Sequence, residues 1–348
     1  MSSRVRYTAV LVTLTALSVL LIALGVSLGS TDISLSAVAR ILASLVGLGD
    51  VSDIDDITRR IVVDLRVPRV LTAFVIGSSL GLAGACLQAM FRNPMADPGV
   101  IGIGAGASFG AVLILYLGLG AVTLWAVPLG AFAGATACTL VVYTLSTRAG
   151  RTRIALLLLI GIAVNFLLGS CTAVVLHAAF SSKGHEIGRQ ILMWTMGGLG
   201  DRTWDHLYIL LPLTTIGMTA LLLNARPLDL FLLGEEQAAS LGVNVQSTKL
   251  QLIVASALLT AAAVAFSGVI AFVGLVVPHM IRQLVGPGHV RLLPASALGG
   301  GVFLVAADLV ARSVVAPVQL PLGVVAGLVG APFFLFLLIR STGRRSWL

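Results

Sequence analysis

Long apolar stretches separated by short polar breaks make up most of the chain. Most are about 18 to 25 residues long, which at ~1.5 Å per residue matches a hydrocarbon layer of ~30 Å crossed by helices. They lack the alternation expected of strands in a membrane barrel. The pattern predicts an all-α integral membrane protein, a single domain over 1–348, with about ten transmembrane helices at 8–29, 67–91, 99–119, 121–146, 154–180, 205–224, 249–267, 269–284, 291–311 and 319–339.

Two of these helices are less clearly marked. Between 249 and 284 only Ser267 and Gly268 offer a break, and the second piece is short for a full crossing, so we expect protein to shield its ends. The first stretch follows Arg4 and Arg6 and resembles a secretory leader. Its apolar part is long and no good cleavage site follows, so we expect a retained first helix.

Composition and charge support this interpretation and orient it. The chain is 58% hydrophobic and 10% charged, which excludes an ordinary soluble domain. With ten helices both termini lie on the same side of the membrane. The loops and termini on that side then hold thirteen Lys or Arg and four Asp or Glu, whereas the other side holds nine Lys or Arg and ten Asp or Glu. The positive-inside rule therefore predicts cytoplasmic termini, with outer segments at 30–65 and 181–204. The net charge of +8 requires no nucleic acid.

The glycine-rich motifs do not indicate nucleotide binding. In "GVIGIGAGASFG" a GxGxxG reading fails, because its last position is Ala107 or Phe109, and no GxxxxGK[ST] motif occurs. We do not expect this chain to bind ATP. Small residues allow helix backbones to approach closely in lipid, which is the expected role of Gly77, Gly81, Gly102, Gly106, Gly110, Gly130 and Gly134.

Metal binding and ion coupling are also not indicated. The five histidines show no ligand spacing, and the three cysteines suggest neither a metal site nor a disulfide framework. An ion-driven carrier normally needs acids within the membrane. Asp308 is the only acid inside an apolar run, near its outer end, and Arg312 four residues later is its expected partner.

Two polar stretches suggest contacts with other proteins. "DLRVPRVL" places Arg66 and Arg69 on the first turn of the second helix, at the outer face, where a helix dipole disfavours cations and a partner is expected. An acidic protein surface or lipid phosphates would fit. The longest inner loop, 225–250, predicts two short helices, with Glu235 and Glu236 in a first turn, Gly242 as a stop, and an apolar face formed by Ala238, Ala239 and Leu241.

Together these stretches resemble the permease subunits of bacterial type II ABC importers for iron–siderophore, haem and vitamin B12. The resemblance covers nearly the whole chain through motifs in the same order, including "LRVPRVLTAFVIGSSLGLAGACLQAMFRNPMADPGVIG", "LGEEQAASLGV", "FVGLVVPHMIRQL" and "LPLGVVAGLVGAPFFLFLL". It implies ten helices per subunit and a pathway enclosed by a homodimer or by a pair with a close paralogue. Two ATPase subunits that bind ATP and Mg would lie below, and an extracytoplasmic substrate-binding protein above.

The resemblance also implies residue roles. Docking of the binding protein falls on Arg66, Arg69 and Arg312. Contact with the ATPases falls on Gly234, Glu235, Glu236, Ala238, Leu241 and Gly242. The inner connection between the second and third helices, "QAMFRNPMADPGVIGIGAG", corresponds to part of the cytoplasmic gate, with Asn93 and Met95 narrowing it. A second gate position, often small and polar in the family, falls at the start of the fifth helix, where this chain has Ile154 and Ala155.

We therefore expect a transporter permease and not an enzyme, located in the bacterial cytoplasmic membrane and binding no metal or cofactor itself. Its cargo would be a metal chelate, ferric siderophore or haem before cobalamin. A carrier or channel that works alone is the alternative.

Overall fold

Helices form almost all of the regular structure of this chain. The computed structural model describes residues 3–29, 33–45, 47–48, 54–148, 151–200, 202–316 and 318–342. In chain order the α-helices are α1 (Ser3–Ser27), α2 (Leu35–Leu45), α3 (Asp56–Arg60), α4 (Val67–Met90), α5 (Ile103–Tyr116), α6 (Ala126–Ser146), α7 (Ile154–Ala178), α8 (His185–Thr195), α9 (Trp204–Leu223), α10 (Ala225–Phe231), α11 (Glu235–Ser240), α12 (Val245–Ser267), α13 (Val273–Val285), α14 (His289–Ser313) and α15 (Leu322–Thr342). Shorter π or 3-10 turns lie at Ile61–Arg66, Pro98–Ile101, Leu119–Ala121 and Ala179–Lys183, and β1 (Thr147–Arg148) pairs antiparallel with β2 (Arg151–Thr152).

Each of the ten predicted stretches contains a helix, namely α1, α4, α5, α6, α7, α9, α12, α13, α14 and α15. Within the described residues, seven helices are long and apolar enough to cross a membrane, while the apolar parts of α5, α13 and α15 are shorter. The chain is thus a multi-pass membrane protein, and ten complete crossings with cytoplasmic termini stay a prediction.

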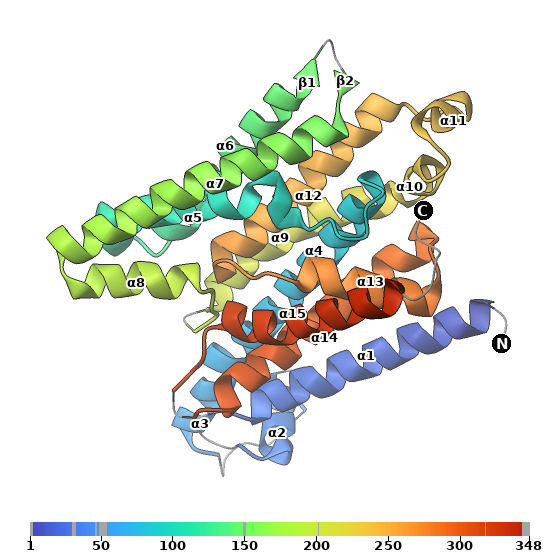
Figure 1. The fold of residues 1–348 in the computed structure, drawn as a ribbon. Coiled ribbons are helices and arrows are strands. Elements are labelled where there is room, and N and C mark those ends of the chain that lie inside the picture. The colour runs from blue at the N-terminus through green and yellow to red at the C-terminus, as the bar shows by residue number, and fades with distance from the viewer. Residues whose placement is uncertain are drawn as a thin grey trace.

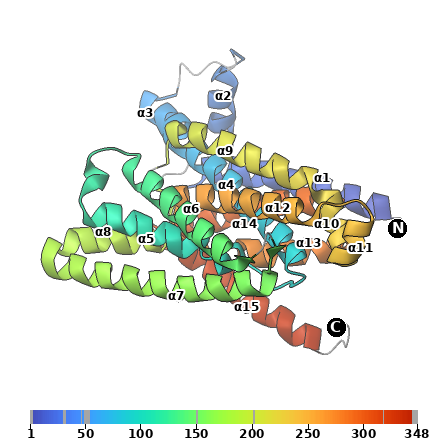
Figure 2. The same cartoon turned by 90° about the horizontal axis from the view of Figure 1, so that it is seen from above.

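The long helices run back and forth between two ends of one bundle (Figure 1). One end carries the β1–β2 hairpin, α10, α11, the start of α1 and the end of α15, and we call it the hairpin end (Figures 1 and 2). The opposite end carries α2, α3 and the three arginines described below, and we call it the arginine end. Helices α2 and α3 occupy part of the predicted outer segment 30–65, and α8, in 181–204, packs against α5 and α7.

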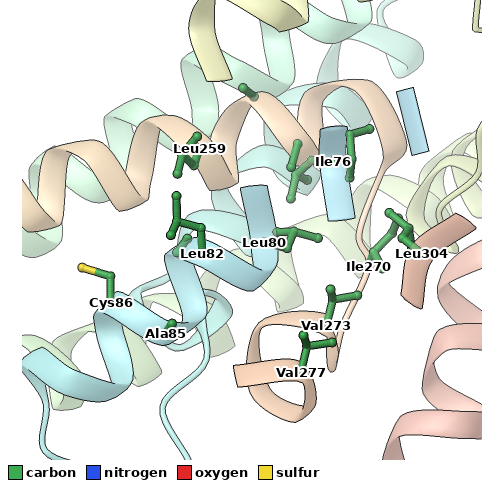
Figure 3. Packing of buried hydrophobic residues seen from close by; sticks show 14 of the residues in the cluster. Ile76, Leu80, Leu82, Ala85, Cys86, Leu259, Ile270, Val273, Val277 and Leu304 are labelled. Atoms are coloured by element: carbon green, nitrogen blue, oxygen red, sulfur yellow. The ribbon is translucent and has the colours of Figure 1, made fainter. Parts of the chain in front are cut away.

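Helix α4 is the centre of the bundle. Most of its side chains are buried, and it packs against α14, α12, α13 and α9. Figure 3 shows Leu80 of α4 beside Val273 and Val277 of α13, and Leu82 facing Leu259 of α12. A helix that is apolar on all sides either faces lipid or is surrounded by other helices, and the burial of α4 shows that it is surrounded.

Glycines allow the closest of these contacts. A Cβ atom added to Gly77 would overlap the carbonyl oxygen of Gly300 in α14, and one added to Gly81 would overlap that of Ser296. Helices α5 and α6 meet in the same way through Gly106, Gly110, Gly130 and Gly134. Gly102 differs from the prediction: it has φ +91° and ends the turn before α5, a conformation that favours glycine.

The predicted break after Ser267 is where α12 ends, and an extended segment leads from there to α13. The loop before α9 contacts the start of this segment, where Gly198 N–H donates to Ser267 C=O at 2.7 Å, and the same loop is held by Leu322, whose N–H donates to Gly197 C=O at 2.9 Å. Irregular backbone inside a membrane is tolerated where protein covers it. The short α13 is therefore shielded, as expected from the sequence.

Replacing Gly300 with Ala should destabilise the bundle. The new methyl group would overlap the Gly77 carbonyl, and because backbone cannot move aside as a side chain can, we expect a loss of about 1–3 kcal/mol. Thermal unfolding in detergent measures this. Gly104→Ala is the control, since a Cβ atom there meets nothing within 4 Å. Equal melting temperatures for the two variants would contradict the predicted contact.

Candidate functional sites at the two ends of the bundle

Two arginines, Arg69 and Arg312, pair with one carboxylate at the arginine end, and Arg66 lies in the same region. Asp308 Oδ1 accepts from Arg69 Nε at 3.1 Å and from Arg69 Nη2 at 2.9 Å, and its Oδ2 lies 3.0 Å from Arg312 Nε. The Arg312 contact is an ion pair whose N–H direction falls short of a hydrogen bond. The Asp308–Arg312 pair predicted from the sequence is confirmed, and Arg69 from α4 joins it.

The end of α1 completes this cluster. Arg66 Nη1 donates to the carbonyls of Val26 and Ser27, at 3.0 and 2.6 Å, while Arg312 donates to those of Gly25 and Leu28 at 3.0 and 3.2 Å. The last carbonyls of a helix have no partner within the helix and carry a partial negative charge, so cations are favoured there. Two of the guanidinium groups therefore tie α1 to α4 and α14.

The structure corrects the local argument made for Arg66 and Arg69. Helical turns run without interruption from Asp56 to Met90, so both arginines lie well inside a continuous helix and do not occupy its first turn. Their partners are Asp308, Gln319 and the carbonyls of α1. Arg66 and Arg312 are each 6% exposed, and the side chain of Arg69 is 11% exposed. Sequence reasoning correctly expected partners, and the structure supplies internal ones.

At the hairpin end, the chain between α9 and α12 forms the two short helices expected from the sequence. Glu235 and Glu236 lie in the first turn of α11, and Gly234 and Gly242 have positive φ at its two ends. Ala238 is buried, whereas Leu233 and Leu241 are 57% and 60% exposed. The expected apolar face is thus split, with Ala238 packed inward and Ala239 and Leu241 facing outward.

An open groove of about 850 Å³ lies beside α11. Its lining combines one arginine, two glutamates and exposed apolar atoms, from Arg151, Leu233, Gly234, Glu235, Glu236, Gln237, Ala239, Val245 and Gln246. The β1–β2 hairpin forms one wall and α11 another. Such a mixed, concave surface is suited to receive part of another protein.

A buried lysine fixes α11 to this hairpin. Lys249 Nζ lies 2.6 Å from Glu235 Oε2 and donates to Thr152 C=O at 3.4 Å, and the Lys249 side chain is only 3% exposed. Thr152 N–H in turn donates to Gln246 Oε1. A charge so far from water needs such partners. Glu235 therefore positions α11 as well as lining the groove.

The connection between α4 and α5 reverses the chain through irregular backbone followed by the 3-10 turn Pro98–Ile101. Asn93 Oδ1 accepts from Met95 N–H at 2.9 Å, and Asp97 Oδ1 accepts from Gly99 N–H at 2.8 Å. Burial raises the pKa of the Asp97 carboxyl, and the hydrogen bond from Gly99 partly opposes this rise. These side chains explain why an apolar chain is interrupted by polar residues here: they satisfy the backbone of the turn.

Of the predicted gate residues, one lines a cavity and the other three do not. Ile154, at the start of α7, lines a cavity of about 170 Å³ with Met90, Phe91, Arg92, Phe231, Glu235 and Lys249. Asn93 and Met95 follow directly in the chain but are not among its lining residues; Met95 is 44% exposed, and Ala155 is also exposed. The cavity joins the end of α4 to the start of α7 and to α10 and α11.

Two polar contacts were missed by sequence reasoning. Asn165, an amide in the apolar run of α7, donates to Gly99 C=O at 2.9 Å and so holds the connection after α4. Asp229 in α10 accepts from His289 at the start of α14. Asn165 could have been noticed because it is a single amide within the apolar stretch "IAVNFLL". Asp229 and His289 are 60 residues apart, and no local pattern relates them. Among the described residues, no group of three or more His, Cys, Asp or Glu could hold a metal ion.

Several permease proteins are similar in sequence to most of this chain. The hemin transport system permease protein of Yersinia pestis is 43% identical over 290 residues, which cover 81% of this chain and 84% of that protein. The cobalamin import system permease protein of Halobacterium salinarum is 45% identical over 278 residues, covering 80% and 73%. The vitamin B12 import system permease protein of Vibrio vulnificus is 38% identical over 318 residues, covering 90% and 94%.

A solved structure agrees with these relatives. It shows an inward-facing conformation of a protein assigned as a metal-chelate type ABC transporter, and it matches with a TM-score of 0.83 and 28% identity over 96% of this chain and 99% of that one. The profile of one transport family matches residues 16–340, nearly the whole bundle described above. The chain therefore belongs to the FecCD transport family, whose members here are permease subunits of ABC transporters and not the catalytic subunits.

Proposed function

We propose that this chain is the membrane-spanning subunit of an ATP-driven importer, which moves a bulky metal chelate across the bacterial cytoplasmic membrane by alternating access. One observation carries the proposal: two surfaces suited to different partners lie at opposite ends of the same helical bundle (Figure 1). The arginine cluster lies at one end, and the groove beside α11 lies at the other. If a binding protein contacts one end and ATPases contact the other, a conformational change of the bundle can couple the two across the membrane.

The hairpin end faces the cytoplasm in this proposal. It carries most of the loop arginines, including Arg92, Arg151, Arg153 and Arg226, as the positive-inside rule requires. Both termini then lie in the cytoplasm, and the arginine end faces outward.

Docking of an extracytoplasmic binding protein is assigned to Arg66, Arg69 and Arg312. Of these, Arg69 has the most accessible contact, to Gln319 at 2.8 Å, and its hydrogen bonds to a carboxylate show the chemistry that it offers to a partner's acid. Arg66 and Arg312 support the surface by holding α1 in place.

Two partner ATPase subunits, which bind the ATP and Mg, would seat on the groove beside α11, with the attachment at Gly234, Glu235, Glu236, Ala238, Leu241 and Gly242. This chain supplies no nucleotide chemistry and binds no cofactor of its own. The exposed leucines give that surface apolar area for contact, and the glutamates beside them give it charges that can orient a partner.

A second copy of the chain, or a close paralogue, would complete the pathway. Helices α7 and α15 present large exposed apolar side chains, among them Phe166, Leu167, Leu328 and Leu335. The gate would lie at Asn93, Met95, Ile154 and Ala155, of which Ile154 lines the cavity that links α4, α7 and α10. Because these residues are not charged, the pathway need not bind its cargo tightly.

The cargo is a metal chelate recognised as a whole, with haem and ferric siderophores ahead of cobalamin. The relatives named for hemin and for cobalamin are similarly close, at 43% and 45% identity. The motifs "NPMADPG" and "VVPHMIRQLVGPGHVRLLPASAL" resemble haem and vitamin B12 permeases. A stand-alone carrier is not favoured, since the relatives are subunits of ABC transporters.

Transport should require ATP and the partner subunits. In proteoliposomes that hold this chain, its ATPase and its binding protein loaded with haemin, we expect uptake only with ATP present on the ATPase side, because the chain has no energy source of its own. Counting haemin inside the vesicles measures this. Uptake of equal size by the chain alone would establish the rival carrier instead.

Arg69→Gln should weaken docking of the binding protein by about tenfold, equivalent to ~1.4 kcal/mol, because one charge of the outer cluster is removed. The dissociation constant should also depend less on salt. Titration against the solubilised complex measures both. Arg189→Gln is the matched control, since Arg189 is an exposed arginine of α8 outside the cluster. Identical affinities for wild type and Arg69→Gln would refute the docking assignment.

Leu233→Asp combined with Leu241→Asp should detach the ATPase subunits. Both side chains are exposed, so the change places charge in the expected interface without disturbing the core. We expect the ATPase that co-purifies to fall at least about tenfold, a loss of ~1.4 kcal/mol or more. Leu48→Asp, at an exposed leucine after α2, serves as the control. Co-purification at wild-type yield would rule out this surface.

A further inference from the structure

Both α4 and α14 hold the same short helix, α10, at the hairpin end. We propose that α4 and α14 act as one rigid body that carries the effect of docking from the arginine end to α10, and that Arg92 and Asp229 are the positioning residues of this connection. The inference rests on the proposed function, in which a binding protein docks at one end and ATPases attach at the other.

The first step is that α4 and α14 cannot easily move relative to each other. They form the most extensive helix contact in the bundle, and Gly77 and Gly81 of α4 lie directly against the backbone of Gly300 and Ser296 in α14. With backbone against backbone, no side chain can change rotamer to absorb a shift. Packed elements of this kind move as units.

The arginine end ties the same two helices together through charge. Asp308 of α14 accepts two hydrogen bonds from Arg69 of α4, and its side chain is 1% exposed. An acidic group of a docked partner would compete for the same guanidinium. Docking at Arg69 therefore acts on both helices through Asp308.

At the hairpin end each helix has its own contact with α10. The Arg92 guanidinium, just after α4, donates to the carbonyl of Phe231, the last residue of α10. Asp229 Oδ1, two residues earlier, lies 2.7 Å from both the backbone nitrogen and the ring Nδ1 of His289, the first residue of α14. One turn of α10 is therefore bonded to both members of the body.

The backbone of Arg92 shows that this contact is specific. Arg92 has φ 47°, in the left-handed region that favours glycine, and it ends α4 with Asn93 N–H donating to Gln88 C=O at 3.1 Å. Glycine would be the ordinary residue at this position. An arginine provides what glycine cannot, the hydrogen bond to α10.

The direction of the hydrogen bond between His289 and Asp229 can be assigned. Its Nε2 is buried and has no hydrogen-bond partner in the described part of the chain. A bare ring nitrogen is less costly to bury than an unpaired N–H, so we assign the proton to Nδ1, which donates to Asp229. The Asp229 carboxylate also accepts at the positive end of α14, where an anion is favoured.

The neighbouring helix α11 is held by other elements. Its ion pair runs from Glu235 to Lys249 of α12, and Lys249 contacts Thr152 of the hairpin. The two short helices pack against each other but have different polar contacts: α10 bonds the α4–α14 body, and α11 bonds α12. The α10 contacts therefore lead directly to the helices that carry Arg69 and Asp308.

The test uses the complete complex in lipid nanodiscs with its ATPase subunits and its binding protein, with haemin as the probe. The readout is the ratio of ATPase rates with and without saturating haemin-loaded binding protein. In Asp229→Ala, which loses both acceptor contacts, this ratio should fall at least fivefold toward one while the ATPase subunits still co-purify. In Asp229→Asn, whose Oδ1 can still accept the backbone N–H of residue 289, most of the ratio should remain.

Arg92→Gly provides an independent arm. It relieves the left-handed backbone and removes the Arg92 side chain with its hydrogen bond to Phe231, so we expect a melting temperature no lower than that of wild type while the ratio falls. Arg189→Gln is the control and should leave the ratio unchanged. Wild-type ratios in both Asp229→Ala and Arg92→Gly would overturn the inference. A wild-type complex that neither binds ATPases nor responds to the binding protein would instead overturn the proposed function, so the two failures are distinguishable.

Discussion

Close contact between helix backbones is the constraint on which the rest of this structure depends. Lipid is as apolar as leucine, so helices within it associate through packing and not through removal of oily surface from water. Gly77, Gly81 and Gly300 permit that packing between α4 and α14, and Gly84 permits it between α4 and α13. Once α4 is fixed in this way, its two ends determine where the arginine cluster and the contacts with α10 can form.

Polar side chains at both ends of the bundle are used mainly to satisfy helix termini. Arg66 and Arg312 bond the last carbonyls of α1, Arg92 bonds the last carbonyl of α10, and Asp229 bonds the first N–H of α14. An unsatisfied backbone group away from water costs several kcal/mol in a membrane protein. The charged residues proposed to contact partners are therefore also structural residues, and we expect substitutions at them to affect both properties.

The sequence predicted the helices well because apolar length is a strong local signal, and the break after Ser267 was correctly placed. It also located the acidic first turn of α11. It could not show that Arg66 lies within a continuous helix, because the preceding residues Asp56–Leu65 are too polar to be recognised as part of a membrane span. The contact between Asp229 and His289 depends on how helices distant in the sequence pack together, and a single sequence does not show this packing.

The arginine cluster also has a consequence for how the protein is made. Arg312 bonds Gly25, a residue 287 positions earlier, and Arg69 meets Asp308 across 239 positions. Because chains are synthesised from the N-terminus, the first helix and α4 must enter the membrane long before their partner in α14 exists. An unfinished chain leaves Arg69 without the Asp308 carboxylate, so a complete arginine cluster marks a subunit whose synthesis has passed α14.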